Sequence, residues 1–167
     1  MRASNDAFSA PLQQLMDEHV SLRADMDHFY EITEDIEFET GPAVVEMFAK
    51  LFERVSSFND KLKTHSKRGL FPLMTRHLGE NDRSIEVMEF EHEKAEQHLL
   101  AFLTEADKKG PSIDENDVQW ITVYAVQAHA TLTQHFAKDE KVLFPLAEKI
   151  LSVEEMEELG RLFQAIG

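Results

Sequence analysis

Residues 135–146 read His-Phe-Ala-Lys-Asp-Glu-Lys-Val-Leu-Phe-Pro-Leu, and the rest of the chain is best interpreted outward from this stretch. Side chains four residues apart are neighbours on one face of a helix, so His135 and Asp139 are expected to lie together. Pro145 predicts a kink or the end of that helix, because proline removes a backbone donor and crowds the preceding turn. The stretch therefore predicts a helix that presents an imidazole and a carboxylate shortly before it bends or stops.

Parts of this stretch occur twice, at an offset of 73 residues. The sequence Leu-Phe-Pro-Leu stands at 70–73 and again at 143–146, and Glu18-His19 recurs as Glu91-His92. A repeat of this length suggests two helical hairpins related by an approximate two-fold axis.

The two copies differ where ligands are expected. His135 and Asp139 precede the second Leu-Phe-Pro, whereas Leu62 and Ser66 hold the corresponding positions in the first copy. Leucine cannot coordinate a metal, and serine is a poor ligand for iron. The pattern indicates a metal bundle in which half of one ligand set has been lost.

Composition indicates a globular protein of one domain, spanning residues 1–167. Hydrophobic residues make up 43% of the chain, which includes 12 Phe and 7 Met, enough for a substantial core. The formal net charge of −15 argues against nucleic-acid binding, which needs clustered Lys and Arg. The absence of cysteine excludes disulfides, iron–sulfur clusters and thiolate zinc sites.

No apolar run approaches the roughly 20 residues of a membrane span, and the first residues lack the apolar core of a signal peptide. We therefore expect no membrane association and a cytoplasmic location.

Four long segments show helical periodicity, separated by turn residues such as Gly41-Pro42 and Gly110-Pro111. Ser152 with Glu155 is a capping-box pattern, which predicts a short helix over about 152–166. No strand pattern competes. The predicted fold is all-α: an up-down four-helix bundle over about 8–150 with a short extra C-terminal helix.

Four polar side chains fall on the apolar stripes of these helices, namely His19, His92, His135 and Asp139. A buried histidine is often only a structural residue with a satisfied hydrogen bond. Four such groups in one small core, however, cost about 1–3 kcal/mol each if unpaired, and one metal ion would satisfy them all. The constellation therefore favours a metal site.

His65 is a further candidate, because it lies at the edge of the apolar face of the second helix and could reach the interior from another angle. Glu96 and Glu89 are spaced to help His92, although solvated acids are the simpler interpretation in so acidic a chain. The remaining histidines are expected at the surface, at a helix boundary or in the irregular connection: His28, His77, His98 and His129.

The segments around Glu18-His19, Glu91-His92 and 135–145 together resemble the hemerythrin-like HHE cation-binding domain, over about residues 8 to 150. The resemblance implies a four-helix bundle with a non-haem iron centre, usually di-iron. It also implies roles in binding or sensing oxygen or iron, or in repairing nitrosative or oxidative damage.

Under this resemblance His19, His92 and His135 match histidine ligands, and Asp139 stands where the family usually has a bridging glutamate. Aspartate is one methylene shorter, and the expected second-helix motif is replaced by Leu62 and Ser66. The remaining ligands suffice for a mononuclear or incomplete di-iron site, with His65 as a substitute ligand, and zinc would accept the same groups.

The leading functional hypothesis is an iron-binding protein that senses, binds or handles oxygen, nitric oxide or iron. The alternative is a four-helix scaffold or interaction module that has lost part of its metal site. An enzymatic role is open but less favoured, because no hydrolase motif is present and repair members often carry a cysteine-bearing segment that this chain lacks. The sequence indicates no particular protein partner.

Overall fold

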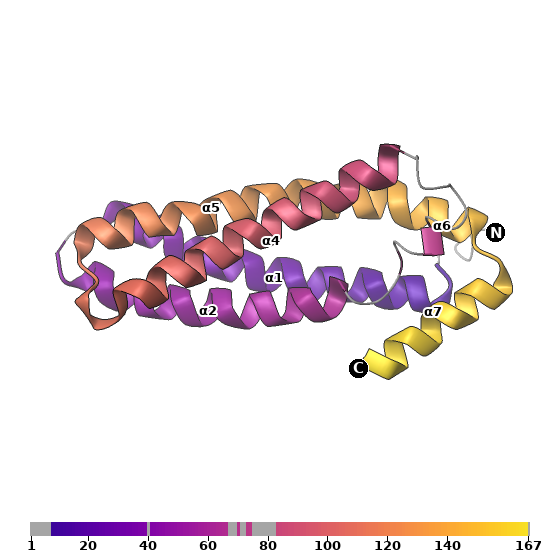
Figure 1. The fold of residues 1–167 in the computed structure, drawn as a ribbon, viewed down its shortest axis with the longest axis horizontal. Coiled ribbons are helices and arrows are strands. Elements are labelled where there is room, and N and C mark those ends of the chain that lie inside the picture. The colour runs from indigo at the N-terminus through magenta and orange to yellow at the C-terminus, as the bar shows by residue number, and fades with distance from the viewer. Residues whose placement is uncertain (1–7, 40, 67–69, 71–72, 75–82, 167) are drawn as a thin grey trace.

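The computed structural model describes residues 8–39, 41–66, 70, 73–74 and 83–166. Four long helices form the body of the molecule: α1 (Ala10–Phe38), α2 (Ala43–Ser66), α4 (Arg83–Lys109) and α5 (Glu115–Lys138). They run up and down beside one another, and every regular element within the described ranges is helical (Figure 1). The predicted all-α bundle is therefore confirmed. His77 and the first Phe-Pro pair, at 71–72, lie outside the described residues.

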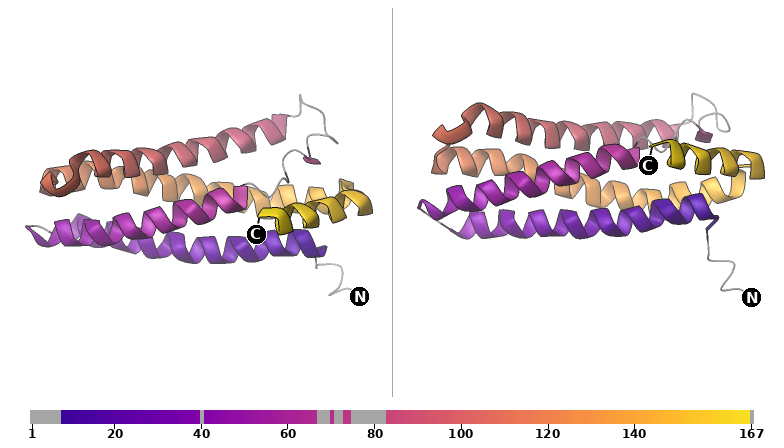
Figure 2. Two further views of the ribbon diagram at one scale, coloured as in Figure 1. Left: turned by 60° about the horizontal axis from the view of Figure 1, so that its bottom comes forward. Right: turned by 90° about the horizontal axis from the view of Figure 1, so that it is seen from below.

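Shorter elements complete the chain: a 3-10 turn η2 (Gly110–Ser112), a π-helical turn η3 (Asp139–Leu143), and helices α6 (Phe144–Ile150) and α7 (Val153–Ile166). Figure 2 shows α7 in yellow at the end of the bundle where α1 begins, and α1 and α7 are in contact. The extra C-terminal helix is thus present. It begins with the predicted capping box, in which the backbone N–H of Glu155 donates to Ser152 Oγ and that of Ser152 donates to Glu155 Oε1.

The apolar core has two parts. The larger fills the length of the bundle and is centred on Phe29, Phe58 and Phe102, which are completely buried. The smaller lies at the end closed by α6 and α7, and includes Phe144 and Leu159. Burying each such side chain stabilises the fold by about 1.5–3 kcal/mol, so helix packing dominates stability.

Turn chemistry sets the helix lengths. Gly41 and Gly110 have φ of 84° and 48°, the left-handed conformation that glycine adopts without steric cost, at the turns after α1 and α4. Asp114 caps α5 through a reciprocal capping box with Asp117. At these turns the chain reverses its direction, so the long helices before and after each turn run antiparallel.

Pro145 does not end the fourth helix directly. The backbone N–H of Phe144 bonds to the carbonyl of Asp139, five residues back, which widens the helix into the π-turn η3. Pro145 then lies in the first turn of α6, where a missing N–H does no harm. The helical register therefore changes at Asp139 and Glu140, the first two residues of η3, which belong to the candidate site.

None of the described helices combines the length and the apolar composition needed to cross a membrane.

Candidate cation-binding site

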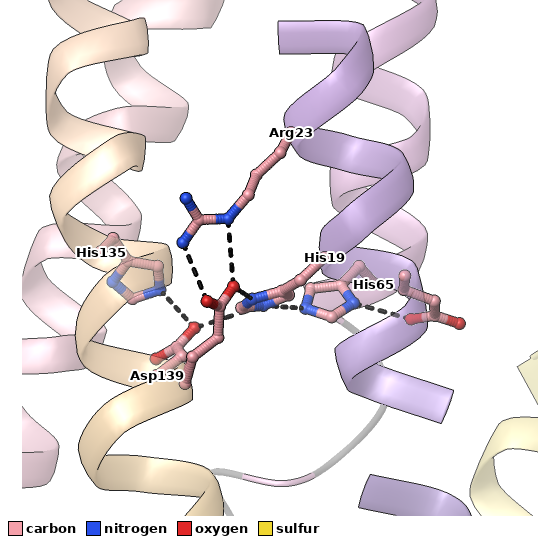
Figure 3. A network of polar contacts seen from close by, with 7 residues as sticks. His19, Arg23, His65, His135 and Asp139 are labelled. Atoms are coloured by element: carbon pink, nitrogen blue, oxygen red, sulfur yellow. Dashed lines mark hydrogen bonds and ion pairs between the residues drawn. The ribbon is translucent and has the colours of Figure 1, made fainter. Parts of the chain in front are cut away.

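Four predicted ligand residues meet where three helices come together. His19 projects from α1, His65 from the last turn of α2, His135 from α5, and Asp139 from the start of η3 (Figure 3). His19, His135 and Asp139 are buried, with exposed fractions of 0%, 1% and 4%, and His65 is partly buried. We call these four residues the histidine cluster.

The inner atoms of the histidine cluster are close together. His19 Nε2 lies 3.1 Å from His65 Nε2 and 3.6 Å from Asp139 Oδ2. Asp139 Oδ2 also lies 3.3 Å from His135 Nε2. Two ligand atoms bound to one tetrahedral metal at about 2.1 Å are about 3.4 Å apart, so these separations are close to those of neighbouring ligands.

His92 lies beside the cluster. Its ring centroid is 5.2 Å from that of His135, but its Nε2 pairs with Glu96 Oε1 at 2.9 Å, one turn further along α4. Glu96 is thus a partner of His92 rather than a purely solvated acid, whereas Glu89 is exposed.

The other histidines are away from the cluster. His28 is exposed, and His98 is half-buried on α4. His129 stacks on Tyr30 at 4.1 Å and pairs with Asp27. These placements agree with the surface and boundary positions expected from the helical wheel.

Three residues that sequence reasoning did not assign to the site form its outer layer. Glu140 Oε2 lies 2.9 Å from His19 Nδ1, and Arg23 binds both oxygens of Glu140. Glu18 Oε1 lies 2.7 Å from His65 Nδ1. Glu18 adjoins His19 and Glu140 adjoins Asp139 in the sequence, so an acid directly beside these two expected ligands was the available signal.

Aromatic rings wall the site. The His19 ring lies 4.4 Å from that of Phe136 and 5.1 Å from that of Phe144, measured between centroids. These rings exclude water from one side of the imidazole. A low local dielectric disfavours isolated charges and strengthens the interaction of a cation with its ligands.

Burial determines the charge states. It lowers the pKa of His19 to about 2 and that of His135 to about 3, and neighbouring imidazoles lower both further. Burial also raises the pKa of Asp139 to about 8, with the carboxylates of Glu140 and Glu91 adding to the effect. At neutral pH His19 and His135 are therefore neutral and Asp139 is protonated, so the contacts of Asp139 with these two histidines are not ion pairs.

Burial likewise lowers the pKa of His92, with the neighbouring Glu96 acting in the opposite direction. A neutral imidazole presents a nitrogen lone pair, which is the form that binds metals.

Within the described ranges, no group of three or more His, Cys, Asp or Glu side chains is placed so that it could hold a metal ion. The donor types nevertheless fit a cation. Three imidazole nitrogens and one carboxylate oxygen suit iron or zinc, and the buried atoms His135 Nδ1 and Asp139 Oδ1 have no hydrogen-bond partner. The side chains therefore supply suitable donor types, and they would have to move to enclose an ion.

Comparison with known proteins agrees with this chemistry. The family model of the hemerythrin HHE cation binding domain matches residues 10–147, which covers the four long helices, η3 and part of α6. A search of curated proteins found no match. Because the family match spans most of the 167 residues, the chain belongs to the hemerythrin HHE cation-binding domain family.

Proposed function

We propose that the protein binds one iron ion tightly in the histidine cluster. The observation that carries this proposal is a chain of contacts of 3.1–3.6 Å, which runs from His65 Nε2 to His19 Nε2, then to Asp139 Oδ2 and on to His135 Nε2. Packing alone offers no reason to keep four polar side chains here, because apolar residues would avoid the cost of burying them.

Iron is the favoured ion because hemerythrin-like domains typically bind iron, and imidazole with carboxylate oxygen suits it. Zinc would accept the same donors. A second, weaker position would lie toward His92 and Glu96, which the short side chain of Asp139 reaches less well than a glutamate would. The proposed centre is accordingly mononuclear.

A centre of this kind would bind or sense a small molecule such as oxygen or nitric oxide, or handle iron itself. Three or four protein ligands leave open coordination positions, which such molecules need. His65, whose side chain is 11% exposed, is the most exposed member of the cluster.

The test is the metal content of protein expressed in iron-supplemented medium and purified without chelator or affinity metal. We expect about one iron per chain, with an absorption spectrum that changes between air and nitrogen. His135→Ala should lose the iron. His28→Ala, which removes an exposed histidine from α1, should keep it. Full occupancy by two irons would contradict the mononuclear centre.

The second candidate is a metal-free scaffold. Leu62, at the position of a lost ligand, is completely buried in the larger apolar core, as expected of a bundle drifting from metal chemistry. This function predicts no stoichiometric metal and a thermal unfolding temperature unchanged by added iron or by chelator.

A further inference from the structure

The histidine cluster has a carboxylate on each of its outer sides. Glu140 Oε2 lies 2.9 Å from Nδ1 of His19, and Glu18 Oε1 lies 2.7 Å from Nδ1 of His65. In each case the carboxylate lies at Nδ1, whereas the Nε2 atoms of the two histidines lie 3.1 Å from each other. The two imidazoles are therefore flanked symmetrically, although they come from different helices.

The protonation state of Glu140 follows from Arg23. Arg23 Nε donates to Glu140 Oε2 at 3.1 Å, and its terminal nitrogen donates to Oε1 at 3.0 Å. A bidentate guanidinium pair of this kind holds the carboxylate in its ionised form, which can only accept hydrogen bonds. The hydrogen between Glu140 and His19 must consequently reside on Nδ1 of His19.

This assignment determines the inner side of His19. A neutral imidazole whose hydrogen is on Nδ1 has its lone pair on Nε2, and this atom of His19 lies 3.1 Å from His65 Nε2. Glu18 Oε1 lies 2.7 Å from His65 Nδ1, where it can accept a hydrogen carried by that nitrogen. With both outer nitrogens engaged in this way, the two Nε2 atoms are left to bind a single cation.

We propose that Glu140 and Glu18 are positioning residues that fix His19 and His65 with their Nε2 atoms turned toward a single cation. His65 thereby provides the ligand from α2 that Leu62 cannot provide. This inference rests on the proposed function and deepens it. Carboxylates that hold the outer nitrogen of a metal-binding histidine are a general feature of metal sites, because they set both tautomer and ring orientation.

The π-turn η3 explains how neighbouring acids take different roles. Asp139 and Glu140 are adjacent, yet Asp139 contacts the inner Nε2 atoms and Glu140 the outer Nδ1 of His19. Both oxygens of Glu140 are already engaged by Arg23, and one also by His19. Glu140 is therefore a support for His19 and not a ligand.

The test begins with the ¹⁵N spectrum of His19 in the metal-free protein, because protonated and bare ring nitrogens have well-separated shifts. We expect a hydrogen on Nδ1 in the wild type and in Glu140→Gln, whose amide oxygen still accepts, and a hydrogen on Nε2 in Glu140→Leu. His19 carrying its hydrogen on Nε2 in the wild type would overturn the proposal, as would an unchanged tautomer in Glu140→Leu.

Anaerobic titration with iron(II) provides the second readout. Glu140→Leu and Glu18→Leu should each weaken binding by about 10–100-fold, and Glu140→Gln should restore most of it. Glu148→Leu is the matched control, since Glu148 also accepts two hydrogen bonds, from Ser9, but contacts no imidazole in the described structure. Circular dichroism confirms that each variant is folded.

The outcomes separate the two proposals. A wild-type protein that fails to bind iron(II) contradicts the proposed function, and the tautomer experiment still decides the positioning role in the metal-free protein. Tight binding in the wild type with no difference between Glu140→Leu and Glu148→Leu overturns the positioning role alone.

Discussion

Leu62 and His135 occupy corresponding positions in the two halves of the chain, and both are buried to within 1% of complete. Leu62 packs in the larger apolar core, whereas His135 faces Asp139 one helical turn away. Equal burial thus surrounds Leu62 with hydrocarbon in one half of the bundle and places His135 beside a carboxylate in the other. The difference shows that depth alone does not make a position suitable for a ligand, because the polar groups around it differ.

In our proposal, His65 supplies the ligand that Leu62 cannot supply. His65 lies three residues after Leu62 on α2 and reaches His19 from the side. Its outer nitrogen is held by Glu18 from α1, which links the two helices. Substitutions can make the two halves more alike, or can separate the contribution of each half to the free energy of unfolding from its contribution to iron binding.

The largest effect is expected from His135→Leu, which gives both halves the same residue. Iron binding should fall by more than about 100-fold, because the variant removes a ligand outright. The free energy of unfolding of the metal-free protein should change by less than about 1 kcal/mol, because losing an imidazole with an unpaired Nδ1 is offset by the loss of its Nε2 contact with the buried Asp139. Iron titration and urea unfolding check the two parts, and iron binding that survives the substitution would count against the site.

Leu62→Ala tests the other half. Removing these buried methyl groups should lower the free energy of unfolding by about 2–5 kcal/mol through lost burial and a residual cavity. Iron(II) affinity should change by less than about threefold, because Leu62 supplies no ligand. Urea unfolding of the metal-free variant measures the first quantity. A large fall in affinity would show instead that the Leu62 side chain holds His65 in place.

Asp139 makes cation binding depend on pH. Its pKa of about 8 means that it is protonated at pH 7, so binding an ion there should release close to one proton. His19 and His135, with pKa values of about 2 and 3, should release none. Affinity should therefore rise about tenfold per pH unit below pH 8 and level off above it.

Calorimetry in buffers of different ionisation enthalpy counts the released protons. Asp139→Asn, which has no proton to lose, should bind more weakly and with little dependence on pH. The same proton release in wild type and variant would assign the proton to another group.

The smallest effect is expected at the N-cap of α5, remote from the cluster along that helix. Asp114→Ala should remove one capping hydrogen bond, from the backbone N–H of Asp117, and cost about 0.5–2 kcal/mol in free energy of unfolding. Iron affinity should stay at the wild-type value. Thermal unfolding and iron titration of the same sample would show whether stability and binding are separable.

Helical periodicity predicted the bundle well, because nearly every apolar residue on the stripes of α1, α2, α4 and α5 is a core residue. The same reasoning placed His19 and His135 inside, since burial on a regular helix depends only on angular position. It also placed His65 at the edge of its helix face, from which packing of α2 against α1 directs it to His19.

The outer layer of the site could not be read from the sequence in the same way. Arg23 and Glu140 are 117 residues apart, and their contact depends on how α1 packs against α5 and η3. The π-turn changes the helical register just where Glu140 occurs, so a regular helical wheel misplaces it. Helical periodicity placed His92 on the apolar stripe of its helix, with the other candidate ligands. In the structure its Nε2 pairs with Glu96 Oε1, a contact that depends on the side-chain rotamers of both residues.

The most direct test of the account is a crystal structure of the iron-loaded protein, with the ion located by anomalous scattering. The account predicts one strong iron peak within bonding distance of Nε2 of His19, His65 and His135 and of Asp139 Oδ2, with Glu140 remaining on Nδ1 of His19. An iron bound without His65, or one centred on His92 and Glu96, would contradict it.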